Sequence, residues 1–103
     1  MQVKIGDIIG ELVLVASDMK GNENYWKLAE GKVKSITINS KGRRVKADHF
    51  YTLDADEIEA NTTWMTEAPN LVLTLEPFIL TDELRERVVK WIEQTNAKEA
   101  KYV

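Results

Sequence analysis

Residues 25–51 read YWKLAEGKVKSITINSKGRRVKADHFY, and this stretch decides the fold class. Two runs of strand-forming residues flank the turn 39–42 (NSKG), whose Asn, Ser and Gly are typical of a hairpin loop of three or four residues. After the turn, side chains alternate in character, one set being Val45, Ala47, His49 and Tyr51. We therefore predict a β-hairpin whose second strand runs to Tyr51 and contains a half-buried His49.

The first strand of this hairpin changes parity along its length. Trp26, Leu28 and Ile36 fall on one side of an extended chain, whereas Val33 falls on the other. Because side chains alternate between the two faces of a strand, a regular strand cannot bury all four. We expect a β-bulge or a break near residues 29–31 or just after Val33.

Three further segments complete the predicted sheet and its connections. Residues 8–16 form an apolar strand with Ile9 on one face and Leu12 on the other, so the strand lies either in a barrel or beneath a helix. Residues 17–24 are polar and predict a loop, and residues 71–75 (LVLTL) predict a short strand.

A single amphipathic helix is predicted over residues 81–96. Thr81 is a good N-cap, and Asp82 and Glu83 follow it at the positive end of the helix dipole. Apolar residues recur at helical spacing after that, beginning with Leu84 and Val88. The tail, residues 97–103, has no apolar period and is expected to fray.

These elements predict one α+β domain, mainly β, over residues 1–103. Residues 1–80 form the β-rich part, either a small bent antiparallel meander or an SH3-like barrel, and the C-terminal helix covers it. A flat sheet backed by the helix is the alternative. The chain is 44% hydrophobic and 30% charged, as in ordinary globular domains.

Composition excludes several classes of chemistry. The chain has no cysteine and one histidine, which excludes disulfides, thiolate nucleophiles and a structural zinc site. Its five glycines are scattered and form no phosphate-binding loop. The longest apolar run, residues 8–16, is too short to span a bilayer. We therefore expect a cytoplasmic protein without a cofactor, a metal, a membrane segment or enzymatic activity.

Two local clusters remain as candidates for binding. Residues 54–59 (DADEIE) carry four carboxylates, which form a solvated acidic turn, hold a hard cation, or contact a basic partner. This segment is either one helical turn after a cap or a loop. Trp64 and Met65 lie in residues 61–70, where no periodicity is evident, and we predict that they form an exposed apolar anchor for a protein partner.

The hairpin is also rich in basic residues. Seven lysines or arginines fall between Lys27 and Lys46, against one acid, Glu30. If the two strands present them on one face beside an aromatic ring, they suit single-stranded nucleic acid. Otherwise they occupy a solvated face and protect an edge strand from aggregation. The candidate nucleic-acid residues are Lys32, Lys34, Lys41, Arg43, Arg44 and Lys46.

Residues 26–51, together with the step FILTDE at 78–83, resemble small uncharacterised proteins encoded by phages and prophages of Gram-positive bacteria. That resemblance covers about two thirds of the chain and implies an SH3-like β-unit followed by a terminal helix. It further implies a cytoplasmic accessory protein that acts through phage or host partners. It transfers no catalytic residue to this sequence.

Together these observations favour a non-enzymatic binding or adaptor module that contacts a protein partner or a second copy of itself. The alternative is a nucleic-acid-binding module that uses the basic hairpin, residues 32–46.

Overall fold

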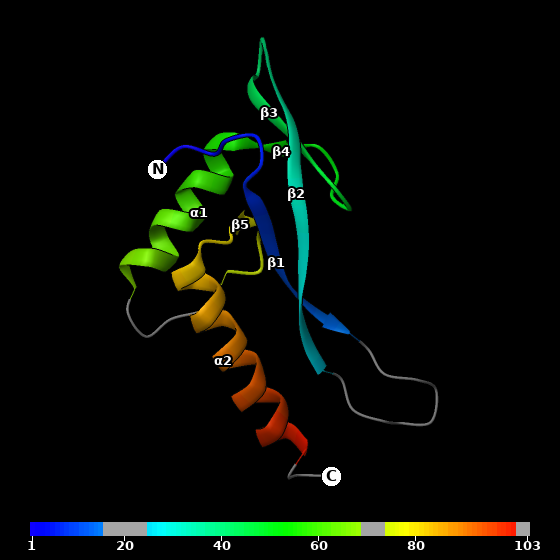
Figure 1. The fold of residues 1–103 in the computed structure, drawn as a ribbon, viewed down its shortest axis with the longest axis vertical. Coiled ribbons are helices and arrows are strands. Elements are labelled where there is room, and N and C mark those ends of the chain that lie inside the picture. Colours follow the sequence, from blue (N-terminus) through cyan, green and yellow to red (C-terminus); the bar gives the residue numbers. More distant parts are fainter. Residues whose placement is uncertain (16–24, 69–73, 101–103) are drawn as a thin grey trace.

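The computed structural model describes residues 1–15, 25–68 and 74–100, with the last three of these described by backbone alone. Five antiparallel strands form one curled, half-barrel sheet in the order β4-β3-β2-β1-β5, and two helices lie along one side of it (Figure 1). The predicted fold class, α+β and mainly β with a C-terminal helix, is confirmed. The elements are β1 (Ile8–Val15), β2 (Tyr25–Asn39), β3 (Gly42–Ala47), β4 (Leu53–Asp54), α1 (Ala55–Glu67), β5 (Phe78–Ile79) and α2 (Asp82–Ala100).

Strand β2 is the central strand of the sheet. Its 15 residues pair with β1 through residues 25–32 and with β3 through residues 33–39. The register shifts between Val33 and Ser35, so Lys34 is an extra residue on β2. This confirms the irregularity predicted just after Val33. A bulge increases the local twist and bends the strand, so β2 can pair with β1 in one half of the curled sheet and with β3 in the other.

The hairpin differs from its prediction at both ends. Asn39 pairs with Gly42, so the loop has two residues rather than three or four, and Gly42 supplies the positive φ of 114° that the tight turn requires. Strand β3 ends at Ala47, not at residue 51. His49 lies in an exposed turn with a φ of 69°, and the prediction of a half-buried strand residue there is wrong.

Helix α1 replaces two segments for which the sequence predicted less structure: one helical turn after a cap or a loop at 54–59, and irregular chain from residue 61. The Asp54 carboxylate accepts hydrogen bonds from the backbone N–H groups of Asp56 (2.8 Å) and Glu57 (3.4 Å), an N-cap that starts the helix. Its buried side is Ala55, Ile58, Thr62 and Met65. That spacing is helical, but a threonine interrupts the apolar pattern, so the helix is inconspicuous in the sequence.

The described residues bury two hydrophobic clusters, which explains why β1 is apolar on both faces. Ile9 lies in the first cluster and Leu12 in the second. The first cluster lies between the curled sheet and the start of α1, and its buried members are Val3, Ile9, Val33, Val45, Ala47, Ala55, Ile58 and Ile79. The second lies between the sheet and α2, and its buried members are Leu12, Met65, Phe78, Leu80, Leu84 and Val88.

Side-chain hydrogen bonds fasten the helices to the sheet. The Thr62 hydroxyl, fully buried on α1, donates to the Ile58 carbonyl and accepts from the backbone N–H of Ile79 on β5, both at 2.7 Å. At the other end of the molecule, the Asn96 amide of α2 accepts from the N–H of Trp26 (2.9 Å) and donates to its carbonyl (3.0 Å). The Asn96 side chain thus pairs with the free edge of β2 as a neighbouring strand would.

Arg87 connects the two helices. It donates to the carbonyls of Met65 and Ala68 at the C-terminal end of α1, where the helix has no basic residue of its own.

Three expectations fall at the limits of the described chain. The predicted loop over residues 17–24 lies outside the described residues. The predicted strand over residues 71–75 does so in part, and its described residues, Thr74 and Leu75, are not in a strand. Helix α2 continues to Ala100, so the predicted end of the helix at residue 96 is too early.

Candidate functional site

A cleft lies beside the N-terminal half of α1. It has a volume of about 360 Å³. Residues of α1 line it together with Glu76 and Pro77, and the Asn61 side chain of α1 donates to the Pro77 carbonyl (3.0 Å). The lining residues are Arg44, Thr52, Leu53, Asp54, Glu57, Ile58, Asn61, Glu76 and Pro77.

The cleft is predominantly acidic. Arg44 is paired with Asp54 at 3.2 Å, so these two charges largely offset each other. No ion pair involves Glu57 or Glu76 within the described part of the chain. Glu11 of β1 lies close enough to Glu76 that, after burial, the Glu76 charge is the second cause that raises the pKa of Glu11. A cationic group that entered the cleft would therefore meet unneutralised carboxylates.

Trp64 extends this face of α1. Residues 57, 61 and 64 follow one another at spacings of four and three, so they lie along one side of the helix. Trp64 is 45% exposed, and Leu75, next to Glu76 in the chain, is 61% exposed. Trp64 itself does not line the cleft but follows the lining residue Asn61 by about one helical turn. Cleft and Trp64 together are called the α1 surface below.

Met65 does not belong to the α1 surface. Its side chain is fully buried in the second core cluster. The prediction that Met65 is exposed beside Trp64 is wrong, because adjacent residues of a helix point in directions about 100° apart and only one of the two faces solvent. The part of Trp64 in partner binding stays a prediction.

The structure separates the six basic residues proposed for nucleic acid. Arg43 lies on the inner face with Val45 and donates to Glu59 (3.0 and 2.7 Å) and to Asp56 (2.7 Å). This network lowers the pKa of Glu59, chiefly through the Arg43 hydrogen bonds, and raises that of Arg43 further above its ordinary value, chiefly through Glu59. Arg43 is thus a structural residue that joins β3 to α1.

The other five basic residues lie at different places. Arg44 lines the cleft with Asp54, and Lys41 is at the tip of the hairpin. Lys32, Lys34 and Lys46 are exposed at the bulge, where Ser35 pairs with Lys46. The structure therefore brings together three of the six candidates rather than all of them.

The four carboxylates of the acidic segment 54–59 also have different roles. Asp54 caps α1 and pairs with Arg44, Asp56 and Glu59 hold Arg43, and Glu57 lines the cleft. Within residues 1–15, 25–68 and 74–100, no three His, Asp or Glu side chains lie close enough together to hold a metal ion. The described helices also include none with the length and apolar character needed to cross a membrane.

The sequence analysis did not predict that two acids, Glu57 and Glu76, line the same cleft. Glu57 and Glu76 are 19 positions apart, and only the packing of residues 76–77 against α1 brings them to one cleft. Comparison with protein-family models finds no match, and searches of curated proteins and of solved structures find none either. The functional argument therefore depends on the geometry of this chain alone.

Proposed function

We propose that this chain is a non-enzymatic protein-binding module whose α1 surface takes an extended segment of a partner protein. The observation that carries the proposal is Trp64, a large apolar ring 45% exposed about one helical turn beyond Asn61, which lines the acidic cleft. Trp is enriched at binding hot spots because it supplies a large apolar area with few rotatable bonds. The fitting partner segment carries an apolar side chain for Trp64 and a lysine or arginine for the cleft.

Burial of the exposed part of Trp64 supplies a useful share of the affinity. A tryptophan side chain offers roughly 200 Å² of surface, so about 90 Å² of Trp64 remains for a partner to cover. At about 25 cal/mol per Å², this corresponds to about 2 kcal/mol, or roughly thirtyfold in the dissociation constant.

A peptide-display selection tests the proposal. Random peptides are selected on the wild-type chain and counter-selected on Trp64→Ala, and binding of the enriched peptides is measured by calorimetry. We expect peptides in which Lys or Arg flanks an apolar residue, with affinity reduced roughly thirtyfold by Trp64→Ala. Glu57→Lys combined with Glu76→Lys should weaken the same peptides.

Val89→Ala is the matched control, since Val89 is an exposed apolar residue of α2 outside the cleft. This variant should bind as the wild type does. The proposal fails if no peptide is enriched, or if Trp64→Ala and Val89→Ala bind the enriched peptides equally well. Association of the chain with itself that Trp64→Ala abolishes would identify the partner as a second copy.

A further inference from the structure

The turn that follows β3 is held firmly against β2 and carries two exposed rings. The Asp48 N–H donates to the Lys32 carbonyl at 3.1 Å, and the Phe50 N–H donates to the Ala47 carbonyl at 3.2 Å. The Phe50 ring packs against the first core cluster. On this anchored turn, His49 is exposed and Tyr51 is 94% exposed.

Tyr51 contributes little to the fold that holds it. Its neighbour Phe50 supplies the apolar contact with the core, whereas the Tyr51 ring is almost wholly in water. A single exposed aromatic residue is ordinary on a protein surface. Tyr51 differs from such a residue because lysines lie beside the turn that carries it.

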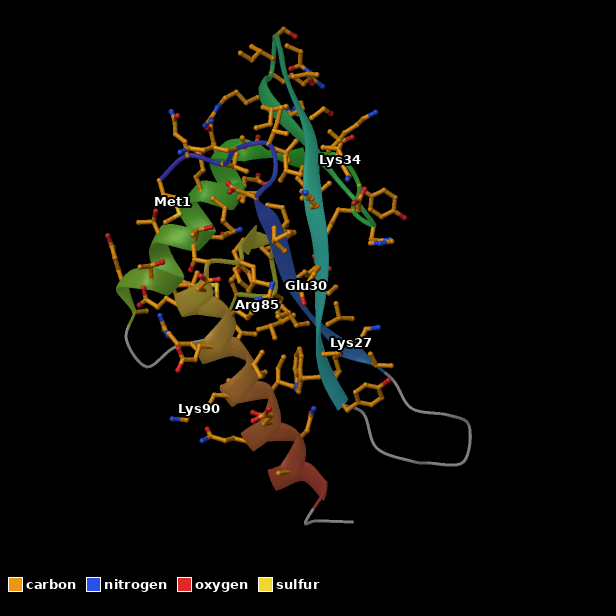
Figure 2. The ribbon with its side chains drawn as sticks, in the orientation of Figure 1. Met1, Lys27, Glu30, Lys34, Arg85 and Lys90 are labelled. Atoms are coloured by element: carbon orange, nitrogen blue, oxygen red, sulfur yellow. The ribbon has the colours of Figure 1, made fainter. Side chains whose placement is uncertain are left out.

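Three lysines lie beside the start of this turn. Lys46 pairs with Ser35 across the strands, and Lys34 is the extra residue of the bulge next to Ser35. Directly opposed residues have Cβ atoms about 5 Å apart and diagonal ones about 7–8 Å apart, so Lys34 and Lys46 are neighbours. Lys32 is joined to the turn through its carbonyl. Figure 2 shows Lys34 on the part of β2 beside the turn.

Asp48 forms an ion pair with one of these lysines. Its carboxylate lies 3.6 Å from the Lys34 ammonium, and both side chains are about half exposed. Exposed pairs of this kind contribute little to stability, so a phosphate oxygen can replace the aspartate. Glu30, two residues before Lys32 on β2, is engaged by α2, because it accepts a hydrogen bond from Arg85 (Figure 2).

The length of the chain limits how far the rings lie from the lysines. Three residues of extended chain span at most about 11 Å, which bounds the distance between the Cα atoms of Asp48 and Tyr51. We infer that Lys32, Lys34, Lys46, His49 and Tyr51 form a binding surface for single-stranded nucleic acid. Its lysines contact phosphates, and Tyr51 and His49 stack on unpaired bases. This surface is called the lysine–tyrosine surface below.

The inference is independent of the proposed protein-binding function. It uses none of the residues that line the cleft, although Thr52 of the cleft follows Tyr51 directly. An acidic peptide would satisfy the lysines but would leave the two rings without flat partners. Loss of Tyr51 therefore distinguishes nucleic acid from a general polyanion.

Fluorescence anisotropy with labelled oligothymidylate and oligouridylate tests the inference on the full chain. Three phosphate contacts give a salt slope of about −2, so affinity should fall roughly twentyfold between about 50 and 200 mM salt. Tyr51→Ala should weaken binding roughly tenfold or more and leave the thermal unfolding midpoint unchanged. Lys34→Glu combined with Lys46→Glu should abolish it. Binding to both oligonucleotides alike indicates phosphate and base stacking, and a preference for uridylate indicates that the ribose hydroxyl is also read.

Lys27→Glu combined with Lys90→Glu is the matched control, because it changes net charge equally at exposed lysines away from the turn (Figure 2). This variant should retain binding to within a few-fold. The inference is overturned by any of three results: no binding at low salt, equal losses in the two double variants, or wild-type affinity in Tyr51→Ala. Equally tight binding of polyglutamate would also overturn it, by showing a site for polyanions in general.

Discussion

Gly31 of β2 lies where the fold leaves no room for a side chain. A Cβ atom placed on Gly31 would lie 1.9 Å from the backbone carbonyl oxygen of Asp48 and 2.8 and 2.9 Å from two ring carbons of Phe50. Atoms cannot approach so closely, so Gly31→Ala must push the turn after β3 away from β2. The tightest contact is with backbone, which rotation of a side chain cannot relieve.

The magnitude follows from the cost of overpacking. Extra methyl groups in well-packed cores cost about 1–3 kcal/mol and occasionally more, and a 1.9 Å contact with backbone belongs at the upper end. We expect Gly31→Ala to lose about 3 kcal/mol or more of unfolding free energy. For a domain of this size that corresponds to a fall of about 12–24 °C in the thermal midpoint.

Thermal and urea unfolding followed by circular dichroism measure this loss. Gly42→Ala is the control, because a Cβ there meets no atom within 4 Å and the cost comes only from its φ of 114°, about 1–3 kcal/mol. Phe50→Ala added to Gly31→Ala should not restore stability, since the Asp48 carbonyl remains. A loss smaller than that of Gly42→Ala, or rescue by Phe50→Ala, would refute the reasoning.

Three further predictions concern the contacts between helices and sheet. Thr62→Val should cost about 1–3 kcal/mol in urea unfolding, because it leaves the buried N–H of Ile79 without its acceptor. Asn96→Asp should cost about 1–2 kcal/mol, because it removes the donor to the Trp26 carbonyl, and hydrogen exchange at β2 should accelerate. The pKa of Glu59 is lowered in the folded chain, so its charge contributes stability that is complete above the ordinary glutamate pKa and is lost as pH falls through the lower folded-state pKa. Glu59→Gln should therefore be less stable than the wild type at neutral pH, and acid unfolding titrations should show this difference disappear at low pH.

Much of the candidate surface was visible in the sequence as residue types but not as an arrangement. The sequence predicts Trp64 and Met65 as an exposed anchor, but only Trp64 is exposed and its neighbour Met65 is core. Six basic residues looked alike, but Arg43 and Arg44 are engaged by carboxylates from elements that the hairpin sequence does not contain. Partners 10 or more positions away cannot be inferred from local spacing.

Local pattern by itself determined the strand character of residues 8–15 and 25–47, the presence of an irregularity in β2 (though not which of its two expected places) and the C-terminal helix. Each depends on side-chain alternation or helical spacing, which a linear chain displays directly. Tertiary structure alone decided that β3 stops at Ala47, that α1 runs to Glu67, and that Glu57 and Glu76 share a cleft. These outcomes follow from contacts between distant segments. Examples are the packing of Asp48 and Phe50 against Gly31 and the hydrogen bond between Thr62 and Ile79. Such contacts contribute free energy only once the chain has folded.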